Sequence, residues 1–252
     1  MIIGAQLYTL RDFCKTTEDF SETLKKVANI GYKTVQVSGV CPYDGAWLKE
    51  ELDKNGLTAP ITHTAPAQIK EDPAAVLKNH RAFGSHRIGI GSCPGGISDS
   101  TYAGFVADFR PIADYFAENG AKFYYHNHYQ EFVRSADGKR FIEKLCEDFP
   151  ADKLGFILDT YWVQFAGGDP AEWLSCLKGR VDCIHFKDMT YLNKTHCMVP
   201  IGEGNLNWTR IIRTAEEMGT EYAFVEQDNC NGEDPFDCMK RSYEFLKAQG
   251  LE

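Results

Sequence analysis

The stretch at residues 117–128, AENGAKFYYHNH, decides the fold, because it joins the end of a helix to the start of a strand. Gly120 is the kind of residue that closes a helix in the left-handed conformation, and KFYYHNH is an aromatic-rich run that favours a strand. Side chains alternate along a strand, so His126 and His128 are expected to face the same side. The fold then depends on how often this helix–glycine–strand unit recurs.

The unit recurs along the whole chain. Helix-like segments end on a series of glycines, and the one around CEDFP is closed by Pro150 instead. The glycines are Gly31, Gly56, Gly84, Gly120, Gly179, Gly219 and Gly250. Eight runs that favour strands precede their helices: IIGAQLY (2–8), KTVQVSG (33–39), LTAPITH (57–63), HRIGIG (86–91), KFYYHNH (122–128), LGFILD (154–159), VDCIHFK (181–187) and YAFVEQ (222–227).

Strict alternation of strands and helices predicts a parallel sheet, and eight units in 252 residues match the size of a single-domain (β/α)8 TIM barrel over 1–252. Helix starts agree, since Asp72 and Asp169 each precede a proline and can act as N-caps. The alternative is a doubly wound open sheet. Such a sheet would usually carry a glycine-rich nucleotide loop after the first strand, where this chain reads LYTLRD.

Composition narrows the class of protein. A formal charge of −9 gives no overall basic surface for nucleic acid or an anionic membrane. The nine cysteines form no C-x-x-C pair, so most are expected to be reduced core residues. The N-terminal MIIGAQLYTLR lacks the features of a secretory signal, and no apolar run approaches a membrane span. We therefore expect a cytoplasmic protein.

Polar residues collect where a barrel carries its function, at the carboxyl ends of the strands. The last four predicted strands end in HNH, LDT, HFKD and EQD. A lone strand-end aspartate is more often a helix N-cap, and a lone histidine more often a core residue. Asp159, His185 and Glu226, however, come from three successive strands and can converge on one divalent cation, with Mn²⁺, Co²⁺, Mg²⁺ or Zn²⁺ as the candidates.

With these residues in this order, the sequence resembles the xylose isomerase-like superfamily of sugar phosphate isomerases and epimerases, which includes inosose dehydratase, dehydroshikimate dehydratase and endonuclease IV. The resemblance spans essentially the whole chain. It is carried by IGAQLYTLRD, YHNHYQEF, LDTYW, HFKD, IGEGNLNW and FVEQD. It implies a metal held by a Glu, an Asp, a His and a Glu from strands five to eight.

The last three of these ligands map onto Asp159, His185 and Glu226, whereas strand five departs from the pattern. Many members read Glu-x-His there, and this chain reads His126-Asn127-His128. The resemblance implies that His126 is the fourth ligand or its substrate-facing replacement, and that His128 and Glu226 are acid/base groups.

Glu131, five residues after His126, has two open interpretations. It swings back as a metal ligand or catalytic base, or it is an outward carboxylate at the start of a helix.

Four further residues are candidates for substrate binding. Lys187 is expected on the same face as His185, where it binds a substrate oxygen unless it is an ordinary surface lysine. Glu203 sits in GEG, a loop placed to close over the mouth of the barrel or merely to turn. His63 and Trp162 are expected in the pocket wall. Tyr8 and Trp208 are further aromatic candidates for stacking on a sugar, although packing in the core is the commoner use of such residues.

Together with these residues, the resemblance implies a divalent-metal-dependent isomerase or epimerase that removes a proton α to the carbonyl of a keto-sugar or related polyol. Dehydration or β-elimination on an inosose or a 3-keto-glycoside is the alternative, which the sequence leaves open. A small carbohydrate is the expected partner, and a homodimer is the default assembly. Two rivals are an endonuclease IV-like nuclease, which the acidic charge disfavours, and a non-catalytic sugar-binding barrel.

Overall fold

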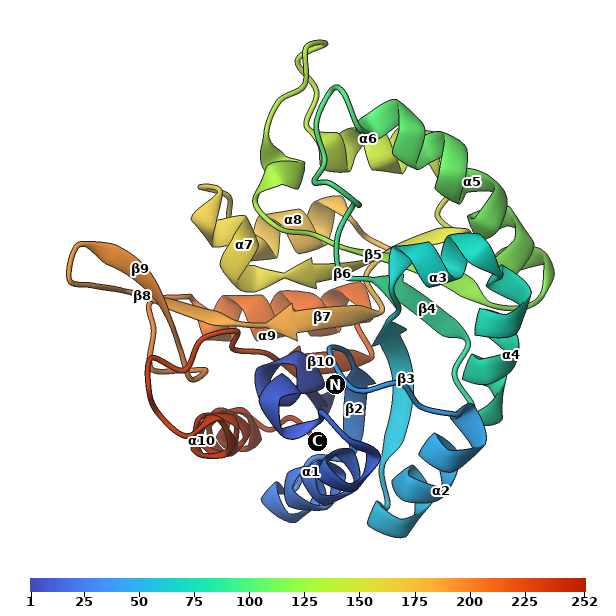
Figure 1. Cartoon of the computed structure of the whole chain (residues 1–252). Coiled ribbons are helices and arrows are strands. Elements are labelled where there is room, and N and C mark those ends of the chain that lie inside the picture. Colours follow the sequence, from blue (N-terminus) through green and yellow to red (C-terminus); the bar gives the residue numbers. More distant parts are fainter.

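Eight parallel strands close into a barrel in the computed structural model, which describes all 252 residues (Figure 1). The strands run in sequence order around the barrel, and β10 closes it against β1. Their bounds are β1 Ile2–Gln6, β2 Thr34–Val37, β3 Thr58–His63, β4 Arg87–Ile90, β5 Lys122–His126, β6 Leu154–Asp159, β7 Cys183–Phe186 and β10 Tyr222–Val225. Each lies within a predicted strand, so the TIM-barrel prediction is confirmed and the open sheet is excluded.

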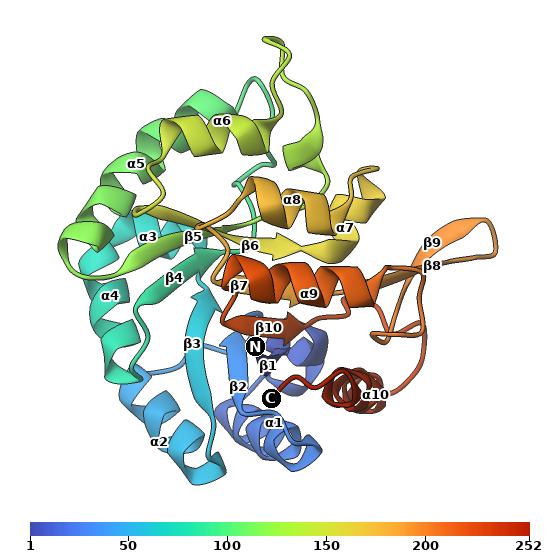
Figure 2. The same cartoon turned by 180° about the vertical axis from the view of Figure 1, so that it is seen from behind.

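Helices surround the barrel on its outside, as both views show (Figures 1 and 2). They are α1 Thr17–Ile30, α2 Gly45–Asn55, α4 Pro73–Ala82, α5 Tyr102–Glu118, α6 Phe141–Asp148, α8 Pro170–Cys176, α9 Trp208–Met218 and α10 Pro235–Ala248. Each ends within a few residues of a predicted glycine or of Pro150. Asp72 and Asp169 cap α4 and α8 as expected, since each carboxylate accepts from backbone N–H groups of the first turn.

Short helices that the sequence analysis did not predict follow four of the strands. They are η1 Leu7–Phe13, α3 Pro66–Glu71, η2 Gln130–Phe132 and α7 Thr160–Phe165. Each begins within a few residues of the carboxyl end of its strand. These helices therefore help to form the walls of the end of the barrel where the strands finish.

The barrel interior is layered. A small apolar cluster of Ile61, Tyr124, Ile157, Cys183 and Phe224 fills its middle. Each of these residues lies two positions before a polar strand-end residue, and the period of two places both on the inner face. The apolar layer thus forms the floor of a polar layer above it.

A hairpin of β8 (Asp188–Leu192) and β9 (Thr195–Val199) projects from the barrel, and it was not predicted (Figure 1). Its turn residues Asn193 and Lys194 both have positive φ, at 50° and 63°, as a two-residue type I′ turn requires. Lysine is an unusual residue in such a turn. The usual sequence signal, an asparagine followed by glycine, is therefore absent.

Asp188, at the base of the hairpin, organises the loop that follows it. Its buried carboxylate accepts from the backbone N–H groups of Gly202 (2.8 Å) and Gly204 (3.1 Å) and from the indole N–H of Trp208 (2.6 Å). A Cβ on Gly204 would lie 2.3 Å from Asp188 Oδ1. The GEG segment is therefore a turn folded around a buried charge, and nothing in its contacts marks it as a lid.

The cysteines fit the sequence expectation in part. Cys14, Cys93, Cys183 and Cys238 are buried, whereas Cys176 is exposed and the others are partly exposed. No helix combines the length and apolar character needed to cross a membrane.

Candidate active site

Four neighbouring strands bring two histidines and two carboxylates together above the apolar floor. They are His126 at the end of β5, Asp159 at the end of β6, His185 in β7 and Glu226 just after β10. One ligand atom from each lies within 4.8 Å of the other three, and all four residues are buried. The structure thus assembles the group of residues assigned to the metal from the sequence.

Hydrogen bonds at the far side of each imidazole orient the two histidines. Nδ1–H of His126 donates to the carbonyl of Gly91 (2.9 Å), which leaves Nε2 facing Asp159 Oδ2 at 3.3 Å. Nε2–H of His185 donates to the carboxamide oxygen of Gln36, which leaves Nδ1 2.9 Å from Glu226 Oε2. Outer partners of this kind commonly orient histidines that bind metals.

The donor set fits a divalent cation. Nδ1 of His185 is buried and lacks a well-directed hydrogen bond, although Glu226 Oε2 lies close by. A buried nitrogen without such a bond is costly unless another group uses its lone pair. Two imidazoles with two carboxylates are typical ligands for Mn²⁺, Co²⁺ or Zn²⁺, and the same set leaves room for Mg²⁺.

Asp159 is placed for both of the roles considered from the sequence, of which the helix cap is observed and metal binding stays a prediction. Its Oδ1 accepts from the backbone N–H of Trp162 (3.0 Å), so it is the N-cap of α7. Its Oδ2 faces the centre of the cluster, near His126 and His185. The cap fixes the carboxylate so that its other oxygen stays directed at the centre of the cluster.

Lys187 is not a surface residue, because its side chain is 1% exposed. Its Nζ lies 2.7 Å from Asp228 Oδ2, 3.2 Å from Glu226 Oε2 and 3.5 Å from Asp159 Oδ2. The buried ammonium thus borders two of the four residues that could hold a metal, Asp159 and Glu226. This placement supports a role in binding substrate oxygens, as the sequence analysis expected.

The charges of the cluster set its protonation. Burial alone would raise the pKa of Asp159 and of Glu226, but the Lys187 ammonium and the neighbouring histidines hold both well below their usual range. Burial would lower the pKa of His185, yet Glu226 and Asp159 raise it to about 9. Both carboxylates are therefore ionised at neutral pH, and a cation would compete with a proton for His185.

His63 and His128 stand beside the cluster without joining it. The His63 ring lies 5.1 Å from that of His126, and its buried Nε2 has no partner. His128 follows the end of β5, with its ring 4.9 Å from that of His126. Burial and the nearby His126 lower the pKa of His128 to about 3 and hold the pKa of His63 well below its usual value, so both rings are neutral at pH 7.

A cavity of about 280 Å³ lies over the cluster. The candidates Tyr8, His63, His126, His128, Lys187 and Glu226 line it, and so do Ser38, Gly91, Ser92 and Asp228. Trp162 lies next to this wall without lining it, since its ring contacts His128 (5.2 Å) and lies 5.3 Å from the Lys187 ammonium. Trp162 therefore supports two residues of the cavity.

Glu131 is placed neither as a metal ligand nor as an outward carboxylate, and a role as catalytic base stays a prediction. It is buried in η2, where Oε1 accepts from the Tyr125 hydroxyl (2.6 Å) and Oε2 from the backbone N–H of His128 (2.8 Å). It lies outside the group that could hold a metal, and it does not point outward. Because both oxygens are already bonded, its contacts are those of a residue that positions the turn carrying His128.

Glu203 and Trp208 also lie away from the cavity. Glu203 is exposed and pairs with Arg241 of α10 (Oε1 to Nε, 2.9 Å), because the turn around Asp188 directs it outward. Trp208 is buried with its indole N–H on Asp188. Gln36 and Ser38 were missed, although their alternation in QVS on the second strand was a signal for inward polar residues.

Comparisons with known proteins agree with this geometry. A family described as "xylose isomerase-like TIM barrel" matches residues 24–249. The chain is 21% identical to an inosose dehydratase of Geobacillus thermodenitrificans over 90% of this chain and 89% of that protein.

Solved structures share the fold. A sugar phosphate isomerase/epimerase from Parabacteroides distasonis superposes with a TM-score of 0.82 at 22% identity, covering 98% of this chain and 93% of the other. An L-ribulose 3-epimerase gives a TM-score of 0.76 at 14% identity, covering 98% and 94%.

Proposed function

Because the chain belongs to the xylose isomerase-like TIM-barrel family, we propose that it is a metal-dependent enzyme that removes a proton from the carbon next to the carbonyl of a keto-sugar or cyclitol. The observation that carries the proposal is the buried cluster, in which one nitrogen each of His126 and His185 faces the carboxylates of Asp159 and Glu226. Similarity to proteins described as epimerases and as an inosose dehydratase supports the class of reaction.

His126, Asp159, His185 and Glu226 would hold the cation. A bound divalent cation supplies Lewis-acid polarisation of the substrate carbonyl, which acidifies the neighbouring C–H bond. Two imidazole ligands favour Mn²⁺, Co²⁺ or Zn²⁺ over Mg²⁺, which prefers oxygen.

The other side chains of the cavity would orient the substrate and move its proton. Lys187 donates to a substrate oxygen from a buried position, where a charged hydrogen bond is strong. The Nε2 atom of His63 lacks a protein partner and is available to a substrate hydroxyl. The contacts of Glu226 with His185 and Lys187 both use Oε2, so Oε1 remains available as a base. His128, neutral and across the same cavity, is the second proton-transfer group.

Isomerisation or epimerisation results if the proton returns to the substrate carbon or its neighbour. Elimination of a β-hydroxyl or alkoxide is the second candidate, and one observation favours it. No second carboxylate stands opposite Glu226. The fifth strand carries the imidazole of His126 at that position, and both oxygens of Glu131 are already bonded. An asymmetric pair suits a base on one side and a proton donor to a leaving oxygen on the other, a role that His128 takes only after it has accepted a proton, because its ring is neutral at pH 7.

Solvent-deuterium incorporation tests the proposal. The protein, loaded with Mn²⁺ or Co²⁺, is incubated in D₂O with ketohexoses, 3-keto-glucosides and inososes, and exchange is followed by NMR. We expect deuterium at a carbon next to the ketone, loss of exchange in Glu226→Gln, and retention in the control Glu203→Gln, whose side chain pairs with Arg241 outside the site. The product separates epimerisation from elimination. A folded, metal-loaded protein that exchanges no substrate would instead support a sugar-binding barrel.

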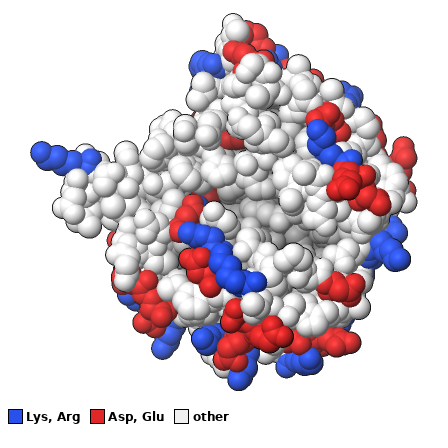
Figure 3. Space-filling model, in the orientation of Figure 1, with Lys and Arg blue, Asp and Glu red and all other residues white.

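We also propose a small carbohydrate, and not nucleic acid, as the partner. On the face seen in Figure 3, lysine and arginine side chains are interspersed with acidic ones, and no continuous basic surface is visible. The net charge of −9 has the same sign as the phosphate backbone. Cleavage of DNA at an abasic site would contradict this proposal.

The expected homodimer stays a prediction, which light scattering tests.

A further inference from the structure

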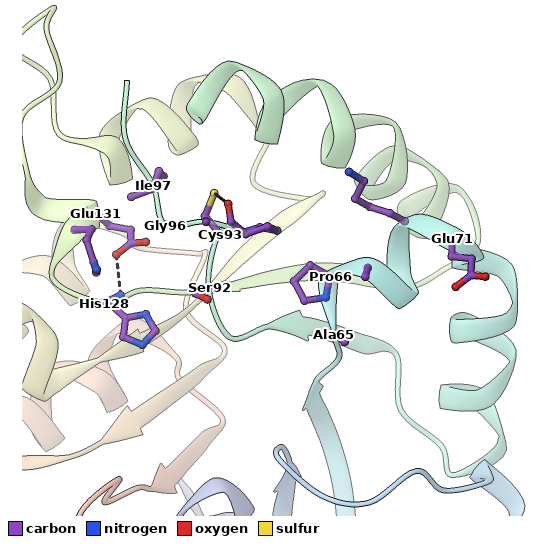
Figure 4. A pocket seen from close by; sticks show the side chains of 14 residues that line it. Ala65, Pro66, Glu71, Ser92, Cys93, Gly96, Ile97, His128 and Glu131 are labelled. Carbon is purple, nitrogen blue, oxygen red and sulfur yellow. Dashed lines mark hydrogen bonds between the residues drawn. The ribbon is translucent and has the colours of Figure 1, made fainter. Parts of the chain in front are cut away.

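A second and larger cavity adjoins the catalytic one. Its volume is about 970 Å³, against 280 Å³ over the metal cluster, and the two share His128 and Ser92 in their walls. Figure 4 shows His128, Glu131 and Ile97 on one side of it, with Ala65 and Pro66 across from them. The end of β5, the loop after β4 and the start of α3 thus enclose a space that opens on the reaction site.

The two volumes suit two parts of one substrate. Pockets for small ligands usually measure roughly 300–1,000 Å³, so the catalytic cavity is at the lower limit and the second cavity near the upper one. The first has room for one sugar ring among its polar side chains. A moiety bonded to that ring would extend past His128 and Ser92 into the larger space.

The wall of the larger cavity is mainly apolar, with Ala65, Ala67, Ile97 and two prolines on it. Two of its polar side chains are engaged already, whereas Glu71, Ser92 and Gln130 make no side-chain hydrogen bond within the protein. Lys70 pairs with Asp108, and both oxygens of Glu131 accept hydrogen bonds from the protein. Along the apolar part of this wall, a second sugar ring would bury hydroxyl groups without partners, which costs free energy. An aromatic or other apolar group avoids this cost.

The wall is held in place by hydrogen bonds that reach His128. The backbone N–H of Cys93 donates to the Tyr125 hydroxyl (3.2 Å), the Tyr125 hydroxyl donates to Glu131, and Glu131 accepts from the backbone N–H of His128. One chain of bonds therefore fixes the loop after β4 relative to the turn after β5. Preformed sites of this kind are typical of small-molecule pockets.

From these observations we infer that the reacting sugar is carried as a glycoside whose apolar aglycone lies in the 970 Å³ cavity. The inference rests on the proposed function and names the substrate class for the same site. The bond between sugar and aglycone passes His128 and Ser92, the residues common to both cavities. A third cavity of about 530 Å³ meets the catalytic one at Ser38, His63, Gly91 and Ser92. It is smaller, so it is the poorer receptor for a large aglycone.

The test compares substrates that differ only in the moiety attached to the sugar. Rates of deuterium exchange or product formation are measured for free 3-keto-glucose, its 4-nitrophenyl glycoside and a 3-keto-disaccharide. We expect kcat/KM to be at least on the order of tenfold higher for the aryl glycoside than for either of the others, as differences in apolar contact produce. Equal values, or preference for the disaccharide, would overturn the inference. Exchange with none of the three would instead remove the proposed function itself.

A matched pair of variants locates the aglycone. Ala67 is an exposed residue in the first turn of α3 and lines the large cavity, so Ala67→Trp fills the cavity with little effect on the core. Ala46 is an exposed residue at the same position of α2 and lines none of the cavities described, so Ala46→Trp is the control. We expect Ala67→Trp to reduce the ratio of kcat/KM for aryl glycoside over free sugar about tenfold, mainly through KM, with no change in the control. A ratio unchanged in a folded Ala67→Trp protein places the aglycone elsewhere and contradicts the assignment.

Discussion

The side chain of Gln36 acts on the cluster through His185, because its carboxamide oxygen accepts the Nε2–H of that ring. We expect Gln36→Met to weaken metal binding about 10–100-fold, the usual effect of losing an outer partner of a metal-binding histidine. The dissociation constant is measured by competition with a coloured chelator.

Gln6→Met is the control for this variant. Gln6 is equally buried on the adjacent strand β1, but it contacts His63, which is not a ligand candidate. Equal losses in the two variants would contradict the role of Gln36.

His80 makes stability depend on pH. Burial lowers its pKa to about 4 in the folded state, despite its bond to the Val76 carbonyl, while the unfolded value is about 6.5. The folded state thus favours the neutral ring. The contribution of neutral His80 to the free energy of unfolding is fully present above pH 6.5. It is lost as the pH falls from 6.5 through about 4, and the total loss is about 3 kcal/mol.

Urea unfolding at pH 7.5 and pH 4 measures this contribution. We expect the difference in the free energy of unfolding to be about 3 kcal/mol smaller in His80→Gln than in the natural protein. His86→Gln is the control, since His86 is exposed. A pH dependence unchanged in His80→Gln would refute the assignment.

At single residues, the sequence predicted which side chains would gather at the end of the barrel better than it predicted their individual contacts. Asp159, His185 and Glu226 were found because strand ends of a barrel meet at one edge. The role of Glu131 depends on the Tyr125 hydroxyl and on the backbone N–H of His128, and neither bond follows from spacing alone. Glu203 was misplaced because the direction of its loop is set by the distant Asp188.

Among the elements, α5 and the loop after the hairpin each contain a glycine whose replacement by alanine should change stability, in opposite directions. Gly104 lies in the first turn of α5 with open space around an added Cβ, so Gly104→Ala is expected to stabilise the protein by about 0.5 kcal/mol. In Gly204→Ala the new methyl group would meet the Asp188 carboxylate, and we expect a loss of about 1–3 kcal/mol. Urea unfolding measures both. A neutral Gly204→Ala would show that the loop is not fixed by Asp188.

Local sequence patterns predicted the eight strands and the ends of their helices, because each signal lies within a few residues of the element it marks. The hairpin escaped prediction since Lys194 adopts a positive φ without the glycine that usually announces it. The short helices η1 and α7 begin directly at the ends of their strands, where the strand pattern hides them.

For the whole molecule, metal binding is expected to stabilise the fold. The four ligands come from β5, β6, β7 and β10, which are consecutive around the barrel, so the site exists only when these strands are paired. A cation at 100 times its dissociation constant should then raise the free energy of unfolding by about 2.7 kcal/mol.

Chemical unfolding after dialysis against EDTA, with and without Mn²⁺, Co²⁺, Zn²⁺ or Mg²⁺, checks this expectation. The stabilisation should disappear in Asp159→Asn, which keeps the shape of the side chain and removes its charge. Absence of any shift with all four cations in the natural protein would argue against the site.

The double use of Asp159 links the metal position to an optical reporter. One carboxylate oxygen faces the cluster, while the other holds the backbone of Trp162, whose indole ring lies 5.3 Å from the Lys187 ammonium. A second positive charge arriving beside Asp159 alters the electric field across that indole. The fluorescence emission of Trp162 should therefore change in wavelength or intensity as a cation binds. Cation binding could then be followed by intrinsic tryptophan fluorescence, without an added dye.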